Sequence, residues 1–299
     1  MKKQTLRKTV WLAALVATFA LCSETDAAPV PLNFSDGGTD AAPNNTDVDG
    51  YPGLGGGGWV GAWETPENFN DGGSVGAGIE SASPLNGGGN YLNVDFLAGR
   101  TTESGRGGVT RQYDNAEQDY TQPHTITFDY RVDSFPTGFD NFNDRIQIVD
   151  ANLSTAGTTG QNTWGLYVIA QNIWGTAGHV WTTQDGAGFA GSLTDLTPAM
   201  TVVEGTTYSF TLDLDPANNQ YDVSVTDGTN TATGTDLTFR RQQGNVGGYL
   251  GYSFVGSAVG DTAELSVDSI NVIPEPSSVV LFAMGMLVWG VVGSRKRGA

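Results

Sequence analysis

One short segment of the chain concentrates oxygen-bearing side chains that could hold a metal ion. Asp213, Asp215, Asn218 and Asp222 lie there together with Asn219. Carboxylate and amide oxygens are hard ligands of the kind that Ca²⁺ prefers, although the spacing is not that of an EF-hand. The alternative is a solvated turn, because Asp213 and Asp215 are two apart and point to the same side of a strand, away from a core. The segment therefore predicts either a calcium site or a solvated turn.

Aromatic side chains could bind sugar, because the face of an aromatic ring stacks on a pyranose ring. The candidates are Trp164, Tyr167, Trp174 and Trp181. Trp174 lies in the loop-like stretch Asn172-Ile173-Trp174-Gly175, so we expect it to be the most exposed of the four. The alternative for each residue is packing in the core.

Residues for catalysis are few. The seven glutamates between residues 29 and 273 form no Glu-x-Asp-x-x-Glu strand motif of the kind used by glycan hydrolases. The two histidines, His124 and His179, are not in a zinc-binding spacing, and no Gly-x-Ser-x-Gly surrounds a serine. We expect His124, which follows Pro123 at the start of a strand, at the surface. The sequence predicts a protein that is not an enzyme, with glycan cleavage by an aspartate pair as the alternative.

The C-terminal segments are arranged as in a signal that directs a protein to a membrane for export. Pro274-Glu275-Pro276 is followed by an uncharged stretch of about 17 residues from Ser277 to Gly293, the lower limit for a membrane-spanning helix. The basic cluster Arg295-Lys296-Arg297 then ends the stretch and should stay cytoplasmic, which places the body on the other side of the membrane. A buried C-terminal helix of a soluble domain is the alternative.

This tail resembles the PEP-CTERM protein-sorting signal of exported bacterial proteins. The resemblance covers less than a tenth of the chain and rests on the order of its parts: tripeptide, apolar run and basic stop. It implies that an exosortase-type membrane peptidase recognises Pro274-Glu275-Pro276 as a partner. It also implies that the precursor is held in the envelope membrane by its C-terminal helix.

The N-terminal end also indicates export. A basic head that includes Lys2 and Lys8 precedes the apolar stretch Val10–Cys22, and the small residues Ala27 and Ala28 follow. This is the layout of a secretory signal peptide. We therefore divide the chain into a signal peptide (1–28), a body (29–273) and a sorting signal with a transmembrane helix (274–299).

The composition of the body excludes one class of partner. Seven arginines stand against 29 acidic residues between residues 29 and 273, a net charge of about −22, and no lysine lies there. Such a surface repels nucleic acid. The only cysteine, Cys22, lies in the signal peptide, so the body has neither a disulfide nor thiol chemistry.

The body shows short alternating apolar runs that are broken by turn residues, the pattern of an all-β domain. The clearest hairpin pairs Thr207–Leu214 with Gln220–Thr226 around the turn Asp215–Asn219. The alternation of the last strand shifts at Asp268. The remaining predicted strands are Thr125–Val132, Asp144–Val149, Trp164–Ala170, His179–Thr182, Thr231–Thr238, Tyr249–Val255 and Ala263–Val272. We predict two stacked antiparallel sheets, with helices confined to the signal peptide and the tail.

The strand order and the acidic turn give the body a loose resemblance to concanavalin/laminin-G-like β-sandwich domains, which implies a jelly roll. Three functions fit these observations. The first is an exported, non-catalytic protein of the cell surface or extracellular matrix that acts by binding. The second is a carbohydrate-binding module for extracellular polysaccharide, and the third is a glycan-cleaving enzyme.

Overall fold

The described part of the chain is built from β-strands. The computed structural model describes residues 30–32, 59–64, 74–86, 88–97, 105–116, 119–136, 139, 144–151, 162–171, 177–186, 193–240, 248–256 and 260–274. Every regular element within these ranges is a strand, which confirms the all-β prediction. The predicted signal helix and transmembrane helix lie outside the described residues.

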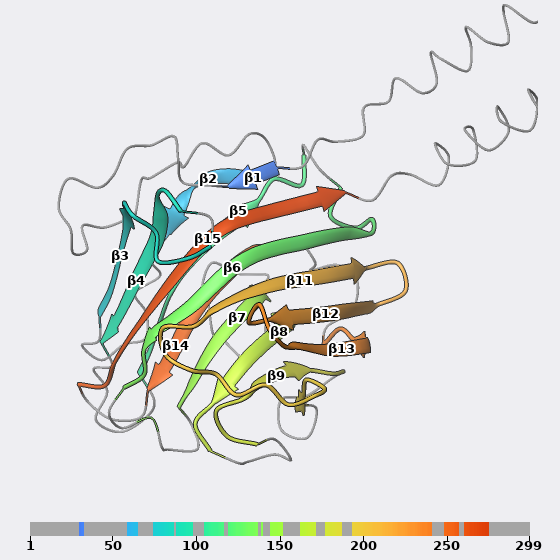
Figure 1. The fold of residues 1–299 in the computed structure, drawn as a ribbon. Coiled ribbons are helices and arrows are strands. Elements are labelled where there is room, and N and C mark those ends of the chain that lie inside the picture. Colours follow the sequence, from blue (N-terminus) through green and yellow to red (C-terminus); the bar gives the residue numbers. More distant parts are fainter. Residues whose placement is uncertain are drawn as a thin grey trace, which may run out of the picture. The chain divides into compact units, whose positions relative to one another are not determined.

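The strands form two antiparallel sheets (Figure 1). Sheet I has the order β13 (Thr231–Thr238), β12 (Gln220–Thr226), β11 (Thr207–Asp215), β6 (His124–Ser134), β15 (Thr262–Pro274), β4 (Tyr91–Leu97) and β3 (Ser74–Glu80), and β1 (Val30–Leu32) pairs with β15. Sheet II has the order β10 (Leu193–Asp195), β9 (Trp181–Gln184), β8 (Asn162–Ile169), β7 (Arg145–Ala151), β14 (Tyr249–Gly256), β5 (Gly105–Tyr113) and β2 (Trp59–Glu64).

The connections are those of a jelly roll. From β4 to β7 the chain alternates between the two sheets. Much later, β14 enters between β5 and β7, and β15 enters between β4 and β6. The central strands of each sheet therefore come from distant parts of the chain, as in other double-sheet sandwiches. The predicted two-sheet architecture is confirmed.

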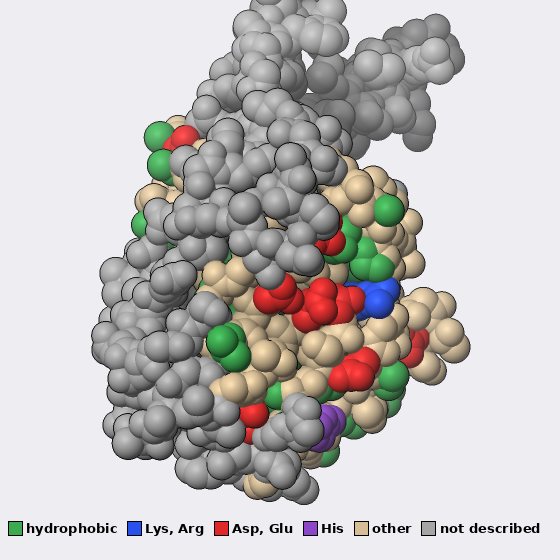
Figure 2. Space-filling view, turned by 90° about the vertical axis from the view of Figure 1, so that its left-hand side faces the viewer, with side chains coloured by type: hydrophobic (Ala, Val, Ile, Leu, Met, Phe, Trp, Pro, Cys, Tyr) green, Lys and Arg blue, Asp and Glu red, His purple; other side chains and the backbone are tan. Residues whose placement is uncertain are grey.

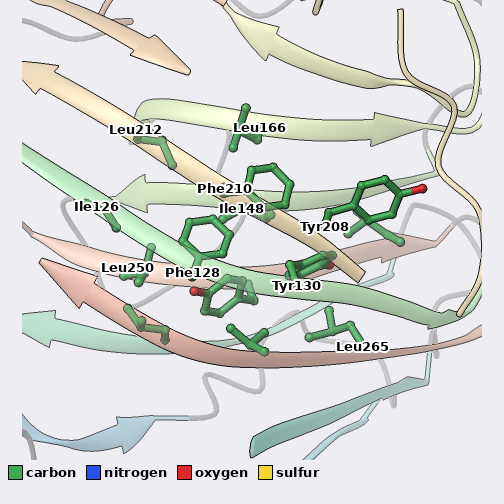
Figure 3. Close-up of a cluster of buried hydrophobic side chains, with 14 of the residues drawn as sticks. Ile126, Phe128, Tyr130, Ile148, Leu166, Tyr208, Phe210, Leu212, Leu250 and Leu265 are labelled. Carbon is green, nitrogen blue, oxygen red and sulfur yellow. The ribbon is translucent and has the colours of Figure 1, made fainter. Parts of the chain in front are cut away.

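The core lies between the sheets, where the inward side chains of both meet (Figure 3). Phe128 and Phe210 stack with their ring centroids 4.8 Å apart, and Trp181 lies edge-on to Phe210 at 4.9 Å. Leu166 and Leu250 of sheet II are fully buried in the same cluster. Burial of each such side chain contributes about 1.5–3 kcal/mol, so these aromatic and aliphatic contacts hold the two layers together.

The β11–β12 hairpin is confirmed, with Asp213 opposite Asp222 and Asp215 opposite Gln220.

The sequence analysis missed three strands in the first half of the body, namely β3, β4 and β5. Glycine explains two of the misses: β3 alternates Gly76 and Gly78 with its apolar residues, and β5 is glycine-rich, so their apolar pattern is weak.

β15 contains an irregularity where its alternation shifts. Leu265 and Val267 are buried before it, and Ile270 and Val272 are buried after it, so the inward positions change parity. Ser269, at the shift, has a positive φ of 56°. An extra residue in one strand produces this shift, so the broken pattern around Asp268 marks a bulge.

Candidate functional site

The predicted calcium ligands are spread along the β11–β12 hairpin, and each carboxylate accepts a hydrogen bond from the protein. Asp213 accepts from the Thr125 hydroxyl at 2.6 Å. Asp215 accepts from the Asn218 side-chain amide at 2.6 Å, and Asp222 accepts from the backbone N–H of Asp236 at 2.7 Å. Within the described ranges, no group of three or more His, Cys, Asp or Glu residues is placed to hold a metal ion. The donor atoms suit Ca²⁺, and the calcium site stays a prediction.

Three of the aromatic candidates are fully buried. Trp164 and Trp181 belong to the core between the sheets. Tyr167 lies in a separate small cluster with Val149, Ile169 and Leu193. Their rings are therefore part of the packing and present no face to a glycan. Trp174 lies outside the described residues.

The sorting signal begins where the fold ends. Pro274, the first residue of the tripeptide, is the last residue of β15. Glu275, Pro276 and the basic cluster Arg295–Arg297 lie outside the described residues, as does the predicted transmembrane helix. No helix in the described ranges is long and apolar enough to cross a membrane.

The prediction that His124 lies at the surface is wrong. Its side chain is only 2% exposed, because His124 begins β6 on the inward face and continues the alternation of Ile126 and Phe128. The ring lies edge-on to Tyr120 with centroids 5.4 Å apart, and Nδ1 is 2.9 Å from the carbonyl oxygen of Gln122. Burial lowers the pKa of this imidazole.

A groove of about 500 Å³ opens over one end of sheet I, where β4 ends and β15 begins. Asp95 of β4 and Glu264 of β15 are directly opposite each other, and Gly76 of β3 lies opposite Asp95 on the other side. Because Gly76 has no side chain, this position of β3 leaves space beside Asp95. Val75 and Leu97 supply apolar wall to the same groove.

The groove is anionic. Glu264 accepts a hydrogen bond from the Asn93 side-chain amide at 3.0 Å. Nearby, Asp133 forms an ion pair with Arg131 at 2.7 Å and accepts from the Ser266 hydroxyl at 2.6 Å. Burial raises the pKa of Asp133. The Ser266 hydrogen bond and Arg131 oppose the rise, whereas the charges of Glu264 and Asp95 add to it. Figure 2 shows several acidic patches on one face of the molecule, with a small basic patch beside the central ones.

The sequence analysis did not find this groove. The carboxylates that line it come from β4 and β15, and the nearby Asp133 comes from β6; these strands are far apart in the sequence and become neighbours only in sheet I. The sequence of β4 does contain a strand pattern, because the buried Leu92, Val94 and Phe96 alternate with Asn93 and Asp95. That alternation predicts a strand with one polar face, but not which carboxylate lies opposite.

Such a groove can accommodate a small polar ligand. Two carboxylates that face each other across adjacent strands repel, and a cationic or hydroxyl-rich ligand between them would relieve that repulsion. The apolar wall from Val75 and Leu97 offers contact to the less polar part of such a ligand.

No protein-family model matches the chain, and the comparison with curated proteins finds no similar sequence. Among solved structures, the fold is similar to a sialidase (13% identity, TM-score 0.41), with 71% of this chain and 17% of that one covered, so the chain spans about a sixth of its length. Peanut lectin is 12% identical with a TM-score of 0.38, covering 70% of this chain and 96% of the lectin. The catalytic domain of a glycoside hydrolase family 131 protein from Coprinopsis cinerea is 9% identical with a TM-score of 0.44, covering 67% and 78%. At these scores no ligand or activity is carried over to this chain.

Proposed function

We propose that the chain is an exported protein, sorted to the cell envelope by its C-terminal signal, whose β-sandwich body works at the cell surface or in the extracellular matrix by binding rather than catalysis. An exosortase-type peptidase is the proposed processing partner. The membrane holds the precursor through the C-terminal helix until the tail is cut.

One observation carries this proposal: the last strand of the sandwich ends at Pro274, the first residue of the tripeptide. Residues Pro29–Ile273 form one compact unit. Removal of the tail would therefore take no strand from either sheet, and the released body would keep its whole core. A sorting signal that is cut off must be removable without loss of any part of the folded body.

The test is the intact mass of the protein from its exporting host, measured separately in the membrane and the medium. We expect a released species that has lost about 25 C-terminal residues, as the position of the tripeptide in the sequence dictates. Glu275→Gln should keep the tail attached and the protein in the membrane fraction. Glu264→Gln, which changes a glutamate of the body, is the matched control and should be processed normally. A full-length tail in the unmodified protein would refute sorting by cleavage.

Extracellular polysaccharide is the proposed ligand of the body. The anionic, partly apolar groove supports a binding role, and Trp174 remains the predicted stacking residue. Depletion of the protein by a panel of insoluble polysaccharides measures binding directly. We expect Trp174→Ala to lower retention without lowering stability, and Thr229→Ala, in the exposed turn between β12 and β13 and away from the groove, to leave retention unchanged. Equal retention of all three proteins would count against stacking at Trp174.

Glycan cleavage is a second candidate, and the opposition of Asp95 and Glu264 favours it. Directly opposed residues on adjacent strands have Cβ atoms about 5 Å apart, so both carboxyl groups can reach one bound ligand, and paired carboxylates are the groups that cleave glycosidic bonds. Reducing-sugar release on the same panel tests this candidate. Activity that both Asp95→Asn and Glu264→Gln abolish would establish it, and a blank panel would leave binding as the function.

A further inference from the structure

The last strand has two halves with different partners on the same side. Residues 262–267 of β15 pair with β4. After the bulge, residues 270–272 pair with β1, with Leu32 opposite Ile270 and Val30 opposite Val272. In the described chain, the end of β15 is therefore held on this side by three residues from the opposite end of the body.

The part of β15 that pairs with β1 stops just before the sorting tripeptide. Ile270 and Val272 are fully buried, whereas Ile273 is 38% exposed. Asn271 donates a side-chain hydrogen bond to the carbonyl oxygen of Ser269 at 2.8 Å, which holds the bulge at the point where β1 replaces β4. The pairing of β15 with β1 thus ends at Val272, and β15 itself ends at Pro274.

The middle residue of β1 is a proline. A proline fits within a strand only where its nitrogen points away from the partner, since it has no N–H to donate. Pro31 can therefore pair with β15 on one side while its other edge lacks a donor. Edges with proline resist the addition of a further strand, so β1 is suited to close this part of the sheet.

Resting on the proposed sorting function, we propose that β1 is a clamp that makes Pro274 the limit of C-terminal processing. Peptidases take their substrates as extended, unpaired chain, and a strand that is paired and buried must open before it can be cut. The peptidase hydrolyses a peptide bond beyond Pro274 with water, so the body keeps the new carboxylate and the tail leaves with the new amino group. Further trimming by peptidases then stops at the strand that β1 holds. Without β1, residues 270–272 lose their partner on this side, and the end of β15 becomes available to trimming.

The same pairing brings the two processing points together. Val30 lies two residues after Ala28, the predicted end of the signal peptide, and Val272 lies two residues before Pro274. Because Val30 and Val272 are opposite each other, their Cα atoms are about 5 Å apart. Each predicted processing point thus lies two residues along the chain from one member of this cross-strand pair.

The test compares the full chain with variants of β1 in the exporting host. Leu32→Pro removes a backbone donor opposite Ile270, and Val30→Gly with Leu32→Gly weakens the strand without a proline. Pro31→Ala is the matched control, because it changes the outer edge and leaves the pairing in place. C-terminal mass determination identifies the end of each mature protein, and hydrogen exchange of the peptide that covers residues 268–274 measures the clamp independently of processing.

We expect the unmodified protein and Pro31→Ala to share one C-terminus at or shortly after Pro274. The two clamp variants should show ragged ends that reach back toward Asp268, and exchange in residues 268–274 about tenfold faster or more, while the remaining sheet stays protected. Identical C-termini and identical exchange in all variants would overturn the clamp and leave sorting intact. An uncut tail in every protein would refute sorting, and the exchange data would still decide whether β1 holds β15.

Discussion

The carboxyl group of Asp268 should make the body less stable at neutral pH than at pH 4. Asp268 lies at the bulge of β15 with only 2% of its surface exposed. Burial raises the pKa of this carboxyl to about 6, and the charge of Asp129 adds to the rise, whereas hydrogen bonds from Ser269 and Ser83 oppose it. The group is therefore held more easily as the neutral acid in the folded state than in the unfolded chain.

The direction of this pH dependence follows from the difference between the pKa of Asp268 in the folded state and in the unfolded chain. Because the pKa is higher in the folded state, the unfolded chain loses its proton first as the pH rises. The contribution is fully present below about pH 4 and is lost as the pH rises through about 6. A rise of about two pKa units corresponds to about 3 kcal/mol, and solvent screening reduces this to about 1–2 kcal/mol.

Urea unfolding of the mature protein at several pH values between 4 and 8 measures this contribution. Asp268→Asn keeps the shape of the side chain and removes the charge. The difference in unfolding free energy between this variant and the unmodified protein should therefore shift in favour of the variant by about 1–2 kcal/mol from pH 4 to pH 7. Asp213→Asn, at an exposed position of β11, is the matched control and should track the unmodified protein. A difference between Asp268→Asn and the unmodified protein that stays constant over this range would refute the argument.

Four further outcomes are expected. Trp181→Ala should lower the unfolding free energy by about 3–5 kcal/mol in urea, because it leaves a cavity beneath the stacked core rings. His124 should act with the opposite sign to Asp268: its lowered pKa makes stability fall as the pH drops below about 6.5, and His124→Gln should flatten the curve between pH 7 and 5. Glu264→Gln keeps an acceptor for Asn93 but removes repulsion with Asp95, so it should stabilise by a few tenths of a kcal/mol at low salt and by nothing at high salt. A calcium-induced rise of the unfolding midpoint by more than about 2 °C that Asp222→Asn abolishes would establish the predicted metal site, and a smaller shift would identify the hairpin as a solvated turn.

The local pattern of the sequence was enough for the elements that depend on near neighbours. Gln220–Thr226 and Thr231–Thr238 were predicted with the bounds that the structure shows. The pairing of Thr207–Leu214 with Gln220–Thr226 was also predicted, and the structure shows it. These features are readable because side-chain alternation is a property of a single strand, and an inward apolar face leaves its mark every second residue.

Only the tertiary structure decided which strands became neighbours. The pairing of β1 with β15 joins residues from the two ends of the body, and the groove joins Asp95 to Glu264. Burial of His124 likewise depends on the sheet that packs over β6. No local pattern encodes these contacts, since the partner of a strand is chosen by the packing of the whole sandwich and a shift of one residue would exchange its buried and exposed faces. The sequence by itself thus determined the all-β class and the β11–β12 hairpin, and the sandwich decided where the carboxylates meet and how the last strand is held.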